Sequence, residues 1–66
     1  MDNKTLLREI ADIADTVALV AYVGGDSKGQ MQVEMSRLCD TYNLQQNDVR
    51  KIKQQITTVL QRQYNL

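Results

Sequence analysis

The feature that most constrains the fold of this chain is the placement of its helix-breaking residues. The chain has no proline, and its three glycines lie within six residues of one another: Gly24, Gly25 and Gly29. Glycine supplies the positive φ angles of turns, and the neighbouring Asp26 and Ser27 can cap a following helix. We therefore predict one loop over residues 24–29, with long uninterrupted elements on either side.

Before this loop, apolar residues recur every three or four positions, which is the spacing of one face of a helix. They are Leu6, Ile10, Ile13, Val17 and Val20. A second stripe of mostly small side chains, which we term the alanine stripe, runs beside the first: Leu7, Ala11, Ala14, Ala18 and Ala21. Two apolar stripes on one helix indicate two packing partners. We therefore predict helix one over about residues 3–23, capped by Asp2 or Asn3, with a close helix–helix interface along the alanine stripe.

The residues after the loop predict two further helices. Helix two, about residues 30–42, carries the stripe Met31, Met35, Leu38 and Tyr42, and Asn43 tolerates the left-handed conformation that ends helices. Helix three, about residues 46–64, starts at Asn47 as its N-cap and carries the stripe Val49, Ile52, Ile56, Val59 and Gln63. The predicted fold is all-α, a small three-helix bundle (long, short, long) in which residues 1–66 form a single domain.

An alternative for residues 30–35 is a β-strand. Polar and apolar side chains alternate there, and the segment could pair with residues 17–23 as a hairpin. An isolated two-stranded hairpin is barely stable in water, which favours the helical interpretation.

A chain of 66 residues can bury only a small core. Disulfides, a metal or a partner chain usually stabilise such domains. Cys39 is the only cysteine and histidine is absent, which excludes an intrachain disulfide and disfavours a structural zinc site. We therefore expect a homo-oligomer, with a dimer as the first expectation and helix one supplying most of its interface.

Composition also argues against an enzyme. Without histidine, the chain has no ordinary general base near neutral pH and no Ser-His or Cys-His pair. We predict no catalytic residues, no metal and no cofactor. Eight basic residues balance eight acidic ones, so no global field attracts nucleic acid or acidic lipid. The longest apolar stretch, Val17–Val23, is far shorter than the roughly 20 residues of a membrane span, and we expect a cytoplasmic protein without a membrane partner.

A short motif around the loop resembles a known family. The run Val23-Gly24-Gly25-Asp26-Ser27, continued by Met31-Gln32-Val33, is similar to the phosphopantetheine attachment site of acyl and peptidyl carrier proteins. The resemblance implies a carrier-like domain in which Ser27 is the attachment site at the start of a helix. Lys28 stands where that family has an apolar residue.

A second resemblance covers residues 35–54, which look like the helix-turn-helix of many repressors. The apolar positions of that motif correspond to Leu38, Tyr42, Leu44, Val49 and Ile52, with small Cys39 and with Asn43 at the turn. The resemblance implies DNA binding through exposed residues of the following helix: Gln45, Gln46, Asn47, Arg50, Lys51 and Gln54. Two adjacent helices over a shared core need nearly the same apolar spacing, so packing alone also explains the match.

The sequence therefore leaves two main functions open. The first is a non-enzymatic regulatory or adaptor protein that acts by helix-mediated protein–protein binding. It is favoured by the two stripes of helix one and by the adaptable side chains of Met31 and Met35. The second is a helix-turn-helix transcriptional regulator that reads DNA with residues 45–54.

Overall fold

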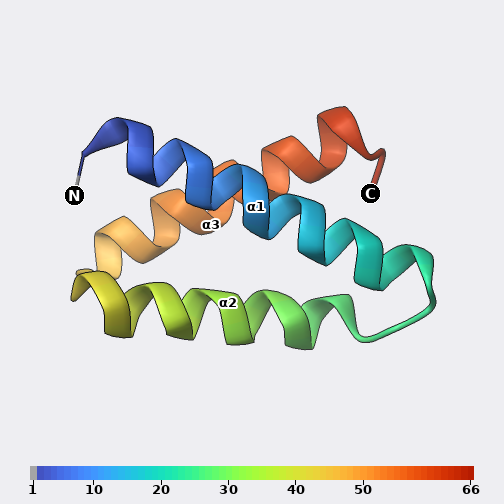
Figure 1. Ribbon diagram of the computed structural model, residues 1–66, viewed down its shortest axis with the longest axis horizontal. Coiled ribbons are helices and arrows are strands. Elements are labelled where there is room, and N and C mark those ends of the chain that lie inside the picture. The colour runs from blue at the N-terminus through green and yellow to red at the C-terminus, as the bar shows by residue number, and fades with distance from the viewer. Residues whose placement is uncertain (1) are drawn as a thin grey trace.

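Residues 2–66 are described by a computed structural model, in which they form three α-helices joined by short linkers (Figure 1). Helix α1 spans Asn3–Tyr22, α2 spans Ser27–Tyr42 and α3 spans Gln46–Gln63. The predicted all-α, three-helix fold is confirmed, with helix lengths of 20, 16 and 18 residues. The strand alternative for residues 30–35 is wrong, because these residues lie inside α2.

Helices α1 and α2 each begin after an aspartate whose carboxylate caps the helix. The Asp2 carboxylate accepts a hydrogen bond from a backbone N–H three residues later at 2.8 Å, and the Asp26 carboxylate accepts one from Gly29 at 3.0 Å. Such bonds satisfy backbone donors that have no partner within the helix. Because Asp26 is the cap, residues 27–29 form the first turn of α2. The predicted loop over residues 24–29 is therefore wrong in its second half.

Helix α3 begins earlier than its predicted cap. Gln45 occupies the N-cap position with an extended backbone, and its side chain makes no capping hydrogen bond. Asn47 lies inside the first turn, so its assignment as the cap is wrong. The carboxylate of Asp48 in that turn complements the positive end of the helix dipole and favours a helix start without a side-chain cap. At the other end, Gln63 is exposed and does not continue the apolar stripe as predicted.

Left-handed residues follow α1 and α2 and turn the chain back. Gly24 has φ +79°, and a Cβ on Gly25 would come within 2.9 Å of the Val20 side chain. Asn43 follows α2 with φ 52° and ψ 52°, in the left-handed conformation predicted for it. Consecutive helices therefore run in opposite directions, and the two chain ends lie at opposite ends of the molecule (Figure 1).

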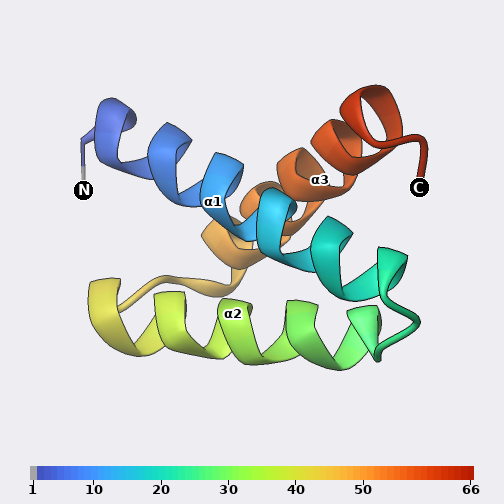
Figure 2. The same ribbon diagram turned by 45° about the vertical axis from the view of Figure 1, so that its right-hand side comes forward.

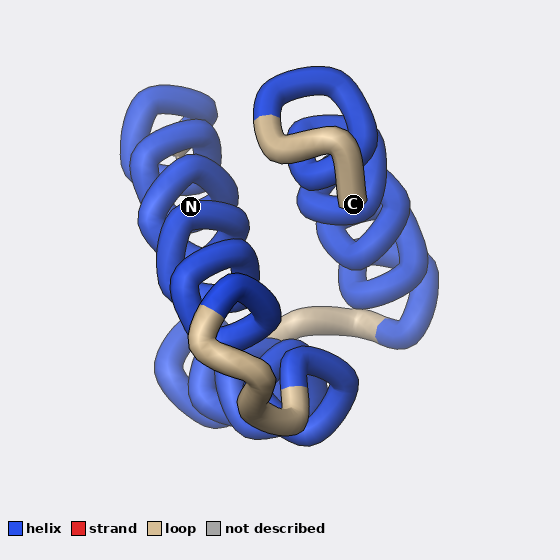
Figure 3. Tube along the Cα trace, turned by 90° about the vertical axis from the view of Figure 1, so that its right-hand side faces the viewer, coloured by secondary structure: helices blue, strands red, loops and turns tan. Residues whose placement is uncertain are grey.

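The core is centred on α1. Among the described residues, α1 supplies five of the buried side chains, and α2 and α3 supply two each. In chain order they are Ile10, Ile13, Ala14, Val17, Ala18, Met35, Leu38, Ile52 and Ile56. Helices α2 and α3 pack chiefly against α1 and have few contacts with each other. Figure 2 shows α3 diverging from α2 beyond their joint, and Figure 3 shows α1 and α3 as two columns above α2.

An ion-pair cluster connects α1 to α2. The Arg37 guanidinium donates to Glu9 of α1 at 3.1 Å and to Glu34 of its own helix at 3.1 Å. The hydrogen bonds to Glu34 and then to Glu9 raise the pKa of Arg37 above its ordinary value. Because Arg37 is about half exposed, the cluster orients the two helices more than it stabilises them.

A tyrosine cluster connects α1 to the end of α3. The Tyr64 hydroxyl donates to the Asp15 carboxylate at 3.0 Å, and the Tyr22 hydroxyl donates to the Tyr64 carbonyl oxygen at 3.0 Å. The hydrogen bond to Asp15 raises the pKa of Tyr64 above its ordinary value. This cluster fixes the end of α3 on α1 at the side where α3 is farthest from α2.

We predict that Ala18→Leu destabilises the fold by about 1 to 3 kcal/mol, because Ala18 is 1% exposed and a larger side chain overpacks the contact. Ala11→Leu is the matched control, since Ala11 is exposed on the same helix and its substitution should cost under about 0.5 kcal/mol. Urea unfolding at low protein concentration measures both. Equal stability of Ala18→Leu and the parent would contradict the packing of α1.

We predict that Tyr64→Phe lowers the melting temperature at neutral pH and reduces its further fall in alkaline solution. The Asp15 carboxylate favours the neutral phenol, so the folded-state pKa lies above the unfolded one. Its stabilisation is therefore fully present below about pH 10 and is lost as the pH rises through the raised value. Tyr42→Phe is the control, because its hydroxyl makes no hydrogen bond within residues 2–66. Identical melting profiles of the two variants would contradict the tyrosine cluster.

Candidate functional site

An open groove, the α2–α3 groove, lies between the two helices that have few contacts with each other. Its volume is about 1260 Å³. Val17 and Ala21 of α1 form its floor, residues from 27 to 40 of α2 form one wall, and residues from 49 to 60 of α3 form the other. The groove is thus a direct consequence of packing both helices on α1.

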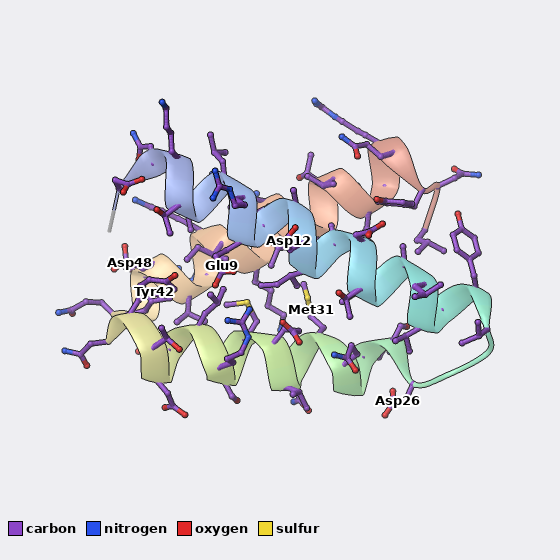
Figure 4. The ribbon with its side chains drawn as sticks, viewed as in Figure 1. Glu9, Asp12, Asp26, Met31, Tyr42 and Asp48 are labelled. Atoms are coloured by element: carbon purple, nitrogen blue, oxygen red, sulfur yellow. The ribbon has the colours of Figure 1, made fainter. Side chains whose placement is uncertain are left out.

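Apolar side chains form the floor of the groove and part of both walls. The larger apolar side chains that line it are Val17, Met31, Met35, Cys39, Val49, Leu60 and Leu66. Met31 extends from α2 toward α1 (Figure 4), and it remains only half-buried, like Val49 and Leu60. Methionine fits irregular partners because its side chain is flexible and polarizable. The groove therefore offers an adaptable apolar surface.

The rim of the groove is polar and electrically balanced. Asp26 and Lys28 lie at the end where α2 begins, Asp40 lies at the end where α2 finishes, and Lys53 lies near the middle of α3. Ser36 and Thr57 line the groove between these ends and are exposed. A partner in the groove would therefore meet two acidic and two basic side chains along the rim.

The residues predicted to contact nucleic acid or a partner lie on a different surface, at the start of α3 and along its outward face. All of them are exposed: Gln45, Gln46, Asn47, Arg50, Lys51 and Gln54. None of them lines the α2–α3 groove, although Lys51 and Gln54 border a shallower groove of about 480 Å³ between α1 and α3.

The charges of the chain are segregated between its helices. Helix α3 carries four basic residues and one acidic residue, a net charge of +3, and because the whole chain is neutral the remainder carries −3. The basic residues of α3 are Arg50, Lys51, Lys53 and Arg62, and none forms an ion pair within residues 2–66. Figure 4 shows Glu9 and Asp12 on α1, in front of α3. Although the net charge of the whole chain is zero, α3 is therefore a basic helix.

The alanine stripe divides into three parts. Ala14 and Ala18 are buried within the chain, Ala21 is half-buried at the floor of the α2–α3 groove, and Ala11 is exposed. Leu7 is 63% exposed beside the shallower groove between α1 and α3. An interface between chains along the whole stripe stays a prediction.

An exposed apolar patch lies at the end of α1 and at the residue that follows it. Leu19, Tyr22 and Val23 are exposed by 64%, 64% and 75%, at positions that share one end of the helix. They lie outside the lining of both grooves.

Two residues singled out by their chemistry lie on the wall of the groove. Ser27, the position of the carrier resemblance, is the first residue of α2 and is half-buried. Cys39 is a half-buried free thiol in the apolar lining. Within residues 2–66, no three acidic or cysteine side chains gather as a metal site would require.

The α2–α3 groove was not predicted from the sequence. The stripe of α2 identified Met31 and Met35 as core, and the structure buries Met35 but leaves Met31 partly open. A usable signal was the small or polar Ser36 and Thr57 beside apolar residues, since such side chains leave a helix edge free to receive a partner.

Comparison of the chain with protein-family models, curated proteins and solved structures finds no match. None of the helices in residues 2–66 combines the length and the apolar character needed to cross a membrane.

Proposed function

We propose that this chain is a non-enzymatic regulatory or adaptor protein that binds an apolar helix of another chain in the α2–α3 groove. The observation that carries the proposal is the separation of α2 and α3, each of which packs chiefly on α1. A fourth helix between them would complete a bundle in which every helix has two neighbours.

The dimensions of the groove fit a helix better than a small molecule. Its volume of about 1260 Å³ exceeds the roughly 300–1,000 Å³ of small-molecule pockets. The α2 wall runs over residues 27–40, which at 1.5 Å per residue is about 20 Å, or close to four turns of a bound helix. Recognition of an amphipathic helix by an apolar groove is a common mode of protein binding.

The residues that line the groove can bind partner helices of different sequences. Met31 and Leu60 present flexible apolar surface from opposite walls, and Ser36 and Thr57 leave room at the rim. Flexible methionine-rich surfaces accept several partners because they can repack around each one. This property suits an adaptor.

The test uses helical peptides selected from a phage library against the immobilised protein and titrated into isotope-labelled protein. We expect the largest amide shifts along residues 27–40 and 49–60. Ser36→Arg should weaken binding by at least about tenfold, because the long arginine side chain would fill the space that Ser36 leaves for the partner helix. Thr41→Arg, exposed on α2 outside the groove, should bind like the parent. Shifts confined to the outward face of α3 would contradict the proposal.

A second candidate function is nucleic-acid binding by α3, and the charge segregation favours it. The exposed amides and guanidinium group of α3 can read base edges. The basic residues of α3 form no ion pairs within residues 2–66 that would have to break on binding phosphate. The short turn at Asn43 joins α2 to α3 as a helix-turn-helix requires.

We predict that Arg50→Ala with Lys51→Ala leaves folding intact but reduces the salt dependence of duplex binding. Each lost phosphate contact lowers the slope of log affinity against log salt by about 0.9, so the pair should lower it by about 1.8. Lys4→Ala with Arg8→Ala removes two exposed cations from α1 and is the control. Fluorescence anisotropy with a short nonspecific duplex measures the slopes. Equal slopes for the two double variants would exclude α3 as the nucleic-acid surface.

A further inference from the structure

We infer that the α2–α3 groove is occupied by α2 of a second copy of this chain, in a two-fold symmetric dimer. The inference rests on the proposed function, since it takes the groove as a docking site, and it names the chain that docks. Three observations support it: the exposed area of the monomer, the edge of α2 and the order of charges along α2.

The first observation is the exposed area. A folded monomer of 7.5 kDa exposes about 4,250 Å² by the usual scaling of area with mass, whereas this chain exposes 4898 Å². The excess of roughly 650 Å² is close to the roughly 800 Å² that each partner buries in a standard protein–protein interface. The exposed area in excess of that of a typical monomer is therefore about the area that each copy would bury in a dimer.

The second observation is the edge of α2 that borders the groove. The edge consists of residues at helical spacing: Gly29, Val33, Ser36 and Asp40. Val33 is 62% exposed just outside the groove lining, and the small side chain of Ser36 beside it allows another helix backbone to come close, whereas the Asp26 carboxylate fills that space at Gly29. The residues from Val33 to Asp40 thus form an α2 ridge beside the groove on the same chain. A two-fold axis lets each copy insert its α2 ridge into the groove of the other.

The third observation is the order of charges along α2. Lys28 lies at its start and Asp40 in its last turn, both on the lining of the groove. Two copies of α2 packed antiparallel, with Val33 opposite the partner's Ser36, bring Lys28 within one residue of the partner's Asp40. The two-fold axis generates this pair twice. A strongly acidic or strongly basic partner would leave charges of one sign unmatched along the rim of the groove.

The test is charge reversal followed by sedimentation equilibrium. Lys28→Asp and Asp40→Lys each replace two attractive pairs with two repulsive ones, and each should raise the dimer dissociation constant by at least about tenfold. An equimolar mixture of the two variants restores opposite charges at both pairs and should recover the affinity of the parent. Both substitutions suit the helix dipole, with the acid in the first turn and the base in the last, so a weaker α2 cannot explain dissociation.

Arg50→Asp, on the outward face of α3, is the matched control and should dimerise like the parent. A parent that stays monomeric would overturn the inference, as would reversals that leave the dimer unchanged or a mixture no tighter than either variant alone. If selected helical peptides still bind the groove of a monomeric parent, the inference fails and the proposed function stands. If no helix and no second copy occupies the groove, both fail.

Discussion

Ala14 and Ala18 of α1 have almost no exposed surface, and the packing around them governs the arrangement of the other helices. Small side chains let a neighbouring helix come close, while Ile13 and Val17 of the same helix fill the remaining core. Both α2 and α3 bury apolar side chains chiefly against α1, so they have few contacts with each other. The groove between them is lined by apolar side chains of α2 and α3 that α1 does not cover completely.

The polar contacts reinforce the same arrangement. Arg37 fixes α2 on α1 through Glu9, and Tyr64 fixes the end of α3 on α1 through Asp15. No hydrogen bond or ion pair between side chains within residues 2–66 joins α2 directly to α3. A chain bound in the α2–α3 groove would therefore break no internal polar contact between side chains of α2 and α3.

Local chemistry made the helices predictable from the sequence, whereas the site was not predictable. Repeats of three and four, with Asp2, Asp26 and Asn43 at the ends, identify the helices because each signal acts within a few residues. The alanine stripe indicated close packing, but only Ala14 and Ala18 are buried, because the extent of burial depends on how the helices cross. The α2–α3 groove arises from the divergence of two helices, which the apolar repeats of three and four do not encode.

The measurement that tests this account most directly is the set of nuclear Overhauser contacts between methyl groups, recorded in an isotope-mixed sample that separates contacts within one chain from those between chains. The account predicts strong contacts within one chain from Ile13 and Val17 of α1 to both other helices. It also predicts none within one chain between Met31 on α2 and Leu60 on α3, which line opposite walls of the groove. Contacts between these two residues within one chain would show that the groove is closed, and would contradict the central claim that α2 and α3 pack chiefly on α1.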